Sequence, residues 1–328
     1  MNDNLRYIIK HHRVRESLNK ALNDEYFNSR DVTEIISKLK LAESSEKLEF
    51  SYPIIFPSCN NRKPSIIKDL KHISSPVYIF VYASQEKLYE YIKQENVTKV
   101  IVPDEFVTIQ RMRKYMQEFM GDKIYWMLDD DIVEARILAN KVSIKWYEGL
   151  YVLDKILAER GVMNSTCIGG PAIEMSNYFY ASGGETKIFK FTKCGYIVNV
   201  FIINGKLCKE KKILFKGDPN VSEDLEITID ARERSGKILQ LMGVTFVCDI
   251  GCLNKAKKSI ASTPVKVKKY TICNYKKFGQ WIKFKFKKDQ VFPITVLRKT
   301  PKAKDPMIEH YLDIQDWMSL KSYIERKK

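Results

Sequence analysis

Short apolar runs alternate with amphipathic segments between residues 50 and 128, and this alternation is the strongest constraint on the fold. The apolar runs predict strands at 52–56, 77–83, 98–103 and 123–128, and the segments between them predict helices at 65–73, 84–94 and 105–120. Strands that alternate with helices of this length are typical of a mainly parallel sheet with helices on both faces. The sequence therefore predicts an α/β fold whose ligands bind beyond the carboxyl ends of the strands.

The pattern continues less regularly after residue 128. We expect helices at 144–160, 222–236 and 314–324, and strands at 165–175, 195–204, 212–217, 237–250 and 282–287. Gly169 and Gly170 are predicted to break one of these strands, and Asn204 and Gly205 to join two others through a turn. The first 48 residues carry helical signals and balanced charge, which indicates an appended helical subdomain.

Three consecutive aspartates, Asp129, Asp130 and Asp131, follow the apolar run that ends at Leu128. Carboxylates this close together repel one another unless a cation neutralises them, and oxygen ligands suit Mg²⁺ or Mn²⁺. Such an ion can bridge carboxylates to a diphosphate and stabilise the charge on a departing nucleoside diphosphate. The triplet therefore predicts a divalent-metal site, and an Asp-rich turn or a helix cap is the alternative.

Glu223 and Asp224 open a predicted helix after a Gly-Asp-Pro-Asn loop. A carboxylate at a helix N-terminus is stabilised in its ionised form, so it is available as a base near neutral pH. An ordinary capping box with Ser222 as the N-cap is the alternative. Gly169 and Gly170 lack side chains and would permit close approach of the backbone to a ligand, although a plain loop explains them equally well.

The positive charge of the chain is concentrated in one segment. Residues 254–304 contain 16 Lys or Arg and a single acid, Asp289, so this segment carries +15 of a formal net charge of +16. Polyanions bind such a segment through phosphate contacts and counterion release, and interleaved aromatic rings can pack on sugars or bases. The aromatic residues are Tyr270, Tyr275, Phe278, Trp281, Phe284 and Phe286. A solvated lysine-rich surface is the alternative.

The remaining composition gives expectations about the compartment. The seven cysteines form no paired C-x-x-C framework, so free thiols are expected rather than zinc ligands or disulfides. No stretch approaches the roughly 20 apolar residues of a membrane helix, and the N-terminus lacks the apolar run of a signal peptide. We expect no membrane insertion and a cytoplasmic location, which is the host cytoplasm if the protein is viral.

The order of these features resembles the GT-A glycosyltransferases. Within them it resembles the TET/JBP-associated group of bacteriophages and eukaryotes, which glycosylates hydroxymethylated pyrimidines in DNA. The matching segments are YPIIFPSCNNR, YWMLDDDI and SEDLEITIDARERSGKIL, and the resemblance covers roughly residues 50–250. It implies a Rossmann-like GT-A catalytic domain at 49–253. The first 48 residues lie outside the resemblance and are expected to form a helical extension, and the basic region at 254–328 is expected to complete the domain and bind the acceptor.

The resemblance also implies roles for the donor-side residues. Asp129 and Asp131 would be the ends of the DxD element and would bind the metal, and Asp130 would support them. A later metal ligand of this fold is often a histidine, but no histidine lies between His72 and His310 in this sequence, so Asp249 could take its place. The arginines implied to reach the nucleotide base or the diphosphate are Arg62, Arg111 and Arg113.

On the acceptor side, the resemblance implies that Asp224 is the general base and that Glu223 positions the acceptor. We therefore predict a metal-dependent enzyme that moves a hexose or pentose from a nucleotide sugar, with UDP-glucose as donor and Mn²⁺ or Mg²⁺ as cofactor. The expected acceptor is the hydroxymethyl group of a modified pyrimidine in DNA, and the expected outcome is inversion. Two alternatives stay open: glycosylation of a protein or polysaccharide, and a non-catalytic DNA-binding module.

Overall fold

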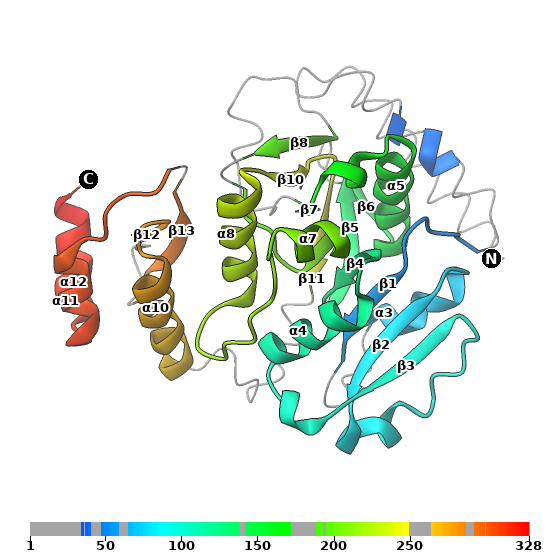
Figure 1. Ribbon diagram of the computed structural model, residues 1–328, viewed down its shortest axis with the longest axis horizontal. Coiled ribbons are helices and arrows are strands. Elements are labelled where there is room, and N and C mark those ends of the chain that lie inside the picture. The colour runs from blue at the N-terminus through cyan, green and yellow to red at the C-terminus, as the bar shows by residue number, and fades with distance from the viewer. Residues whose placement is uncertain are drawn as a thin grey trace.

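The computed structural model shows an α/β fold built around one large sheet (Figure 1). The structure describes residues 34–35, 37–40, 47–58, 65–137, 142–171, 188–192, 195–248, 264–286, 292–298 and 300–327. In this part of the chain, no helix is both long enough and apolar enough to cross a membrane.

The large sheet has eight strands in the order β3-β2-β1-β4-β9-β7-β10-β8. In that order the strands are Val97–Val102, Val77–Tyr82, Ile54–Pro57, Ile124–Leu128, Val200–Asn204, Ile168–Pro171, Ile238–Leu241 and Phe189–Thr192. Four of the seven pairings are parallel and three are antiparallel. The half that contains β3, β2, β1 and β4 is entirely parallel, as the alternation in residues 50–128 predicts.

Helices cover both faces of this sheet. The α-helices are α3 (Ser65–Asp69), α4 (Ile109–Met120), α5 (Trp146–Glu159), α7 (Gly205–Glu210) and α8 (Glu223–Ser235), and the 3₁₀ helices are η1 (Leu70–His72), η2 (Ala83–Tyr89), η3 (Asp104–Phe106) and η4 (Val162–Ser165). Ile54 and Phe56 of β1 pack with α3 and α5, whereas Ile55 packs with α4 and α8. Successive strand residues point to opposite faces, so both faces are buried and the strands read as continuous apolar runs. The predicted Rossmann-like α/β class is confirmed.

A second, smaller sheet begins at the aspartate triplet. It contains β11 (Val244–Cys248), β5 (Ile132–Ile137) and β6 (Val142–Ile144), in that order. The triplet is the turn by which the chain leaves β4 and enters β5. Cys248 pairs with Ile132, so the end of β11 lies beside the same turn.

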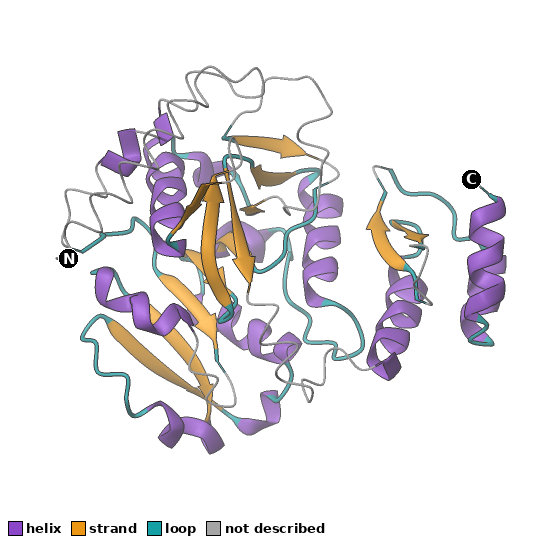
Figure 2. Cartoon of the chain, turned by 180° about the vertical axis from the view of Figure 1, so that it is seen from behind, coloured by secondary structure: helices purple, strands orange, loops and turns teal. Residues whose placement is uncertain are grey.

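The C-terminal elements pack against α8 on the side away from the large sheet (Figure 2). They are α10 (Pro264–Phe278), β12 (Ile282–Lys285), β13 (Ile294–Leu297), α11 (Pro306–Asp313) and α12 (Trp317–Arg326). Leu225 and Ile229 of α8 share a hydrophobic cluster with Tyr275 of α10, while Ile227 and Ala231 face the sheet. Helix α8 is therefore buried on two faces, and its first turn lies between the two parts of the molecule.

Several predicted elements differ from the structure, among them the region 237–250, which forms two strands, β10 and β11, in different sheets. Residues 84–94 were expected to form an α-helix, but the structure has the 3₁₀ helix η2 over Ala83–Tyr89. The described residues 212–217 form no strand, because Asn204 does not make a hairpin turn. Its side-chain oxygen instead accepts from the Leu207 amide at 3.0 Å and caps α7. The domain boundaries at 48 and 253 stay predictions.

Gly169 and Gly170 lie inside β7 and do not break it. A β-carbon on Gly169 would lie 2.8 Å from Leu239, and one on Gly170 would lie 2.2 Å from Ile197 and 2.4 Å from the Val200 carbonyl oxygen. Protein atoms fill the space that side chains would take, which accounts for both glycines without a ligand. Direct contact between them and a donor stays a prediction.

Gly170→Ala should lower the free energy of unfolding by about 1–3 kcal/mol, because the added methyl group overpacks the interior. Gly243→Ala is the matched control, since the closest neighbour of its β-carbon would be the flexible end of Ile35, at 3.1 Å, and Ile188 would lie at an ordinary 3.8 Å. Urea denaturation of the two variants measures the difference. Equal stability of both variants would show that the close approach at β7 is absent.

Candidate active site

The candidate site lies at the carboxyl ends of the central strands. Ser58 follows β1 and Asp129 follows β4, and these strands are parallel neighbours, so both residues lie at one edge of the sheet. The Asp129 amide donates to the Asn199 carbonyl oxygen at 2.8 Å. This bond extends the pairing of β4 with β9 by one residue and fixes the start of the triplet.

Arg113 of α4 joins this edge to the first turn of α8. Its side chain is 2% exposed, and its guanidinium donates to the carboxylates of Asp129 and Asp224. Its Nη1 also lies 3.5 Å from Glu223 Oε1. The ring of Phe201 lies against the guanidinium, 5.1 Å from its carbon to the ring centroid. The two acidic groups that the sequence singled out therefore form a single site.

Burial sets the protonation of this site. It raises the pKa of Asp224 to about 7, opposed by the positive charge of Arg113 and assisted by Glu223 and Asp129. Burial likewise raises the pKa of Glu223. Burial alone would lower the pKa of Arg113, but the carboxylates around it raise that pKa above its usual range, so the guanidinium stays charged. Asp224 can therefore gain or lose a proton near neutral pH, as a general base requires.

The other two aspartates of the triplet have different partners. Ser58 Oγ donates to Asp130 Oδ2 at 3.2 Å, and Asp130 is 9% exposed. Asp131 hydrogen-bonds to the Cys248 thiol, whose pKa is raised by burial and then by the charge of Asp131. The three carboxylates of the triplet thus contact three different residues, Arg113, Ser58 and Cys248.

A divalent ion would need several oxygen ligands around one point. Among the residues that the structure describes, no three His, Cys, Asp or Glu side chains are placed to hold a metal. Asp249, the third predicted ligand, lies outside the described residues and directly follows Cys248, which lies beside Asp131. The described donors do not complete a metal centre, and a site formed by Asp131, Asp129 and Asp249 stays a prediction.

The three predicted arginines have different outcomes. Arg113 lies in the site, as described above. Arg111 is exposed on the same helix, and its Nη1 donates to the Glu105 carbonyl oxygen at 3.0 Å, which ties it to the preceding loop. Arg62 lies outside the described residues. A nucleotide contact by Arg111 or Arg62 stays a prediction.

Sequence reasoning missed Tyr196, which lies beside the first turn of α8. It hydrogen-bonds to Ser222, and burial followed by the charge of Asp224 raises its pKa. The Ser222 side chain makes no capping bond to the helix, so the capping-box alternative for this turn is not observed. Tyr196 stands 26 residues before Ser222 in a segment that reads as an ordinary strand, and no local pattern marks it.

A cavity of about 400 Å³ opens beside Glu223. It is lined on one side by the first turns of α4 and α8, and on the other by α10 and β13. The Glu223 side chain, 14% exposed, contacts both this space and Arg113. The described site therefore has an accessible volume next to its carboxylates.

Five of the six aromatic residues of the basic segment have a different role from the one predicted, and Tyr270 is the exception. Tyr275, Phe278, Phe284 and Phe286 are buried in the third hydrophobic cluster, so they cannot stack on bases or sugars. Trp281 packs against this cluster, and its ring N–H group donates a hydrogen bond to the Glu233 carboxylate. These five rings build the interior of the C-terminal part.

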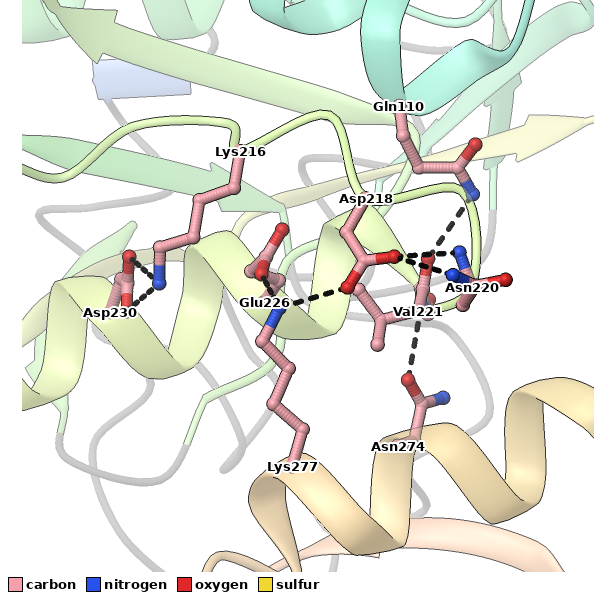
Figure 3. Close-up of polar contacts among 10 residues, drawn as sticks. Gln110, Lys216, Asp218, Asn220, Val221, Glu226, Asp230, Asn274 and Lys277 are labelled. Carbon is pink, nitrogen blue, oxygen red and sulfur yellow. Dashed lines mark hydrogen bonds and ion pairs between the residues drawn. The ribbon is translucent and has the colours of Figure 1, made fainter.

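Several lysines of the same segment pair within the chain. Lys277 Nζ lies 2.6 Å from Glu226 and 3.2 Å from Asp218, which ties α10 to α8 (Figure 3). Lys276 lies 2.7 Å from Asp313. Part of the positive charge is therefore paired with acids of the same chain, whereas Lys269, Lys283 and Lys285 are exposed.

Comparisons with known proteins give no family. No protein-family model matches the chain, and no curated protein sequence matches it. Among solved structures, a UTP-bound UGPase from Acinetobacter baumannii is similar at TM-score 0.37 and 9% identity, and a UDP-glucose pyrophosphorylase from the same organism at TM-score 0.36 and 8% identity. Each similarity covers 65% of this chain and 94% of the other. A TM-score this low does not establish a shared fold, so the α/β assignment rests on the strand order and registers alone.

Arg113→Met should lower the free energy of unfolding by about 3–5 kcal/mol near pH 8, because buried carboxylates lose their cation. The loss should shrink near pH 6, where the carboxyl groups of the variant can bind protons and become neutral. Urea denaturation at the two pH values measures this.

Arg111→Met on the same helix is the control, and it should change the free energy of unfolding by less than about 0.5 kcal/mol. A loss in Arg113→Met that is equal at both pH values would contradict the proposed charge balance.

Proposed function

We propose that this protein transfers a sugar from a nucleotide-sugar donor to an acceptor hydroxyl group. The observation that carries the proposal is the buried bridge in which Arg113 joins Asp129 at the sheet edge to Asp224 at the start of α8. This bridge brings a ligand-binding edge of an α/β sheet within reach of a carboxyl group that titrates near neutral pH. An inverting sugar transfer needs this combination, because the acceptor hydroxyl group must lie close both to the anomeric carbon of the donor and to the base that takes its proton.

The donor that we propose is UDP-glucose, lying beyond the ends of β1 and β4. The Asp129 side chain is 23% exposed there, so a ligand can reach it. A divalent ion would neutralise diphosphate charge if Asp131, Asp129 and Asp249 held it. The described residues do not complete that centre, so the protein's own side chains carry the steps that follow.

In the proposed reaction, the acceptor oxygen forms a bond to the anomeric carbon while the bond from that carbon to the diphosphate breaks. The nucleoside diphosphate leaves with the electron pair, and the hydroxyl proton moves to Asp224. Attack opposite the leaving group inverts the anomeric carbon. Arg113 is a positioning residue, because its bond to Asp224 fixes the direction of that carboxylate.

The acceptor that we propose is a hydroxymethylated pyrimidine in DNA. Exposed lysines on α10 and on β12, namely Lys269, Lys283 and Lys285, support a role in binding the phosphate backbone. A protein or polysaccharide acceptor would use the same chemistry at the anomeric carbon. Labelled UDP-glucose incubated with DNA that contains hydroxymethylcytosine, with proteins and with polysaccharides would separate these acceptors.

Asp224→Asn should lower the rate of transfer by about 10²–10⁴-fold, because the general base is lost. In the wild type, kcat/KM should rise as the pH rises through about 7, since the base must lose its proton and burial places the pKa of Asp224 there. Initial rates of UDP release across the pH range measure both effects.

Glu223→Gln is the neighbouring control. It should raise KM for the acceptor but keep the rise of kcat/KM with pH. If the acid limb persists unchanged in Asp224→Asn, another group is the base. Unfolding midpoints of both variants close to that of the wild type show that folding is intact.

DNA binding should weaken steeply with salt. In a plot of the logarithm of the binding constant against the logarithm of the salt concentration, the slope should steepen by about one unit for each phosphate contact. Lys283→Gln combined with Lys285→Gln should reduce that slope by about two units. Fluorescence anisotropy with a labelled duplex measures it. Binding that is equal at low and moderate salt would reject DNA as the acceptor, and binding without turnover or nucleotide affinity would favour the non-catalytic module.

A further inference from the structure

The cavity beside Glu223 lies where the α/β part meets the C-terminal elements. Ile109 and Gln110 of α4 and Glu223 of α8 line one wall, and Tyr270 of α10 and Thr295 of β13 line the other. Its volume, about 400 Å³, falls in the range of roughly 300–1,000 Å³ that ligand pockets occupy. A ligand in this space would touch residues from both parts of the chain.

The charge of the lining restricts what can bind. Of the described residues that line the cavity, Glu223 alone carries a carboxylate, and none is a lysine or an arginine. Asp224, next in the chain, adds negative charge behind this wall. A phosphate group placed here would meet a carboxylate and, among the described lining residues, no lysine or arginine, and burying a charge without a partner is costly. The cavity therefore favours an uncharged group.

The two walls are held together by hydrogen bonds. Gln110 Nε2 donates to the Val221 carbonyl oxygen and to the Tyr270 hydroxyl, each at 3.1 Å. The Ser222 amide donates to Asn274 Oδ1 at 3.0 Å. These bonds connect α4, the loop before α8 and α10, so the cavity is preformed rather than assembled by the ligand.

The lining is mostly apolar and aromatic around a few polar groups. Leu225, Val267 and Leu297 supply aliphatic surface, and the rings of Tyr196 and Tyr270 supply flat surface. Such a mixture suits a ring that carries hydroxyl groups. The Glu223 carboxylate is the group in the lining that is best able to accept a hydrogen bond from a hydroxyl.

We infer that this cavity binds the acceptor, which presents to it an uncharged ring bearing a hydroxyl group. The inference rests on the proposed sugar transfer, and it adds the chemical class of the acceptor group and makes α10 part of the active site. Glu223 would bond to another polar group of the ring, so that the reacting hydroxyl group can donate to Asp224, next in the chain. The charge of the lining then disfavours the donor diphosphate in this cavity.

The test uses two tryptophan substitutions on the same helix. Val267 lines the cavity, whereas Val265 is 73% exposed and does not line it. Val267→Trp should weaken binding of hydroxymethyldeoxycytidine roughly tenfold or more, and Val265→Trp should leave it unchanged. Thr295→Phe narrows the cavity from the opposite wall and should act like Val267→Trp. Titration calorimetry on the full chain measures binding, with methyl glucoside as a second neutral probe and the nucleoside monophosphate as the anionic one.

Three results would overturn the inference: equal binding in Val265→Trp and Val267→Trp, tighter binding of the monophosphate than of the nucleoside, or no binding of either neutral probe to the wild type. Thermal stabilisation by UDP-glucose is measured in parallel and should be the same in all variants. If UDP-glucose neither stabilises the protein nor is hydrolysed while the neutral probes still bind, the sugar transfer fails and the cavity assignment stands.

Discussion

The arrangement of the site depends on one buried positive charge. Arg113 is 2% exposed and contacts three carboxylates that belong to two distant segments of the chain. Taking a guanidinium out of water is costly unless it is paired and hydrogen-bonded, so Arg113 holds these carboxylates close together. Burial raises the pKa of Asp224 to about 7, because it outweighs the opposing charge of Arg113 and is assisted by Glu223 and Asp129. Arg113 thus joins the two parts of the site, and its bond to Asp224 fixes the direction of that carboxylate.

Helix α8 connects this electrostatic centre to the rest of the fold. Its first turn carries Glu223 and Asp224, one of its faces packs on the large sheet, and the other packs on the C-terminal elements. The clamp of Lys277 on Glu226 and Asp218 fixes α10 against it. The basic segment therefore has a structural role in closing the cavity, in addition to the proposed contacts of its exposed lysines.

Local patterns predicted much of the fold, because they reflect burial. The parallel half of the sheet followed from apolar runs in residues 50–128, and the helix at Glu223 followed from its acidic first turn. The predictions of a strand at 212–217 and of a stacking role for Tyr275 were wrong, because both features depend on which distant residues cover the segment. The metal site was predicted on the assumption that the aspartate triplet needs an external cation. Arg113, sixteen residues before Asp129, supplies a positive charge from within the chain. Contacts between distant segments, such as that of Tyr196 with Ser222, leave no local pattern in a sequence.

A double-mutant cycle between Asp129 and Asp224 tests the central claim most directly. Asp129→Asn and Asp224→Asn each remove a charge with little change of shape, and the free energy of unfolding of the two variants and of the double variant gives their coupling. If Arg113 joins the two carboxylates, their effects should be non-additive by about 1 kcal/mol or more. Effects that add to within about 0.5 kcal/mol would mean that the two residues act independently, and the bridge on which this account depends would be absent.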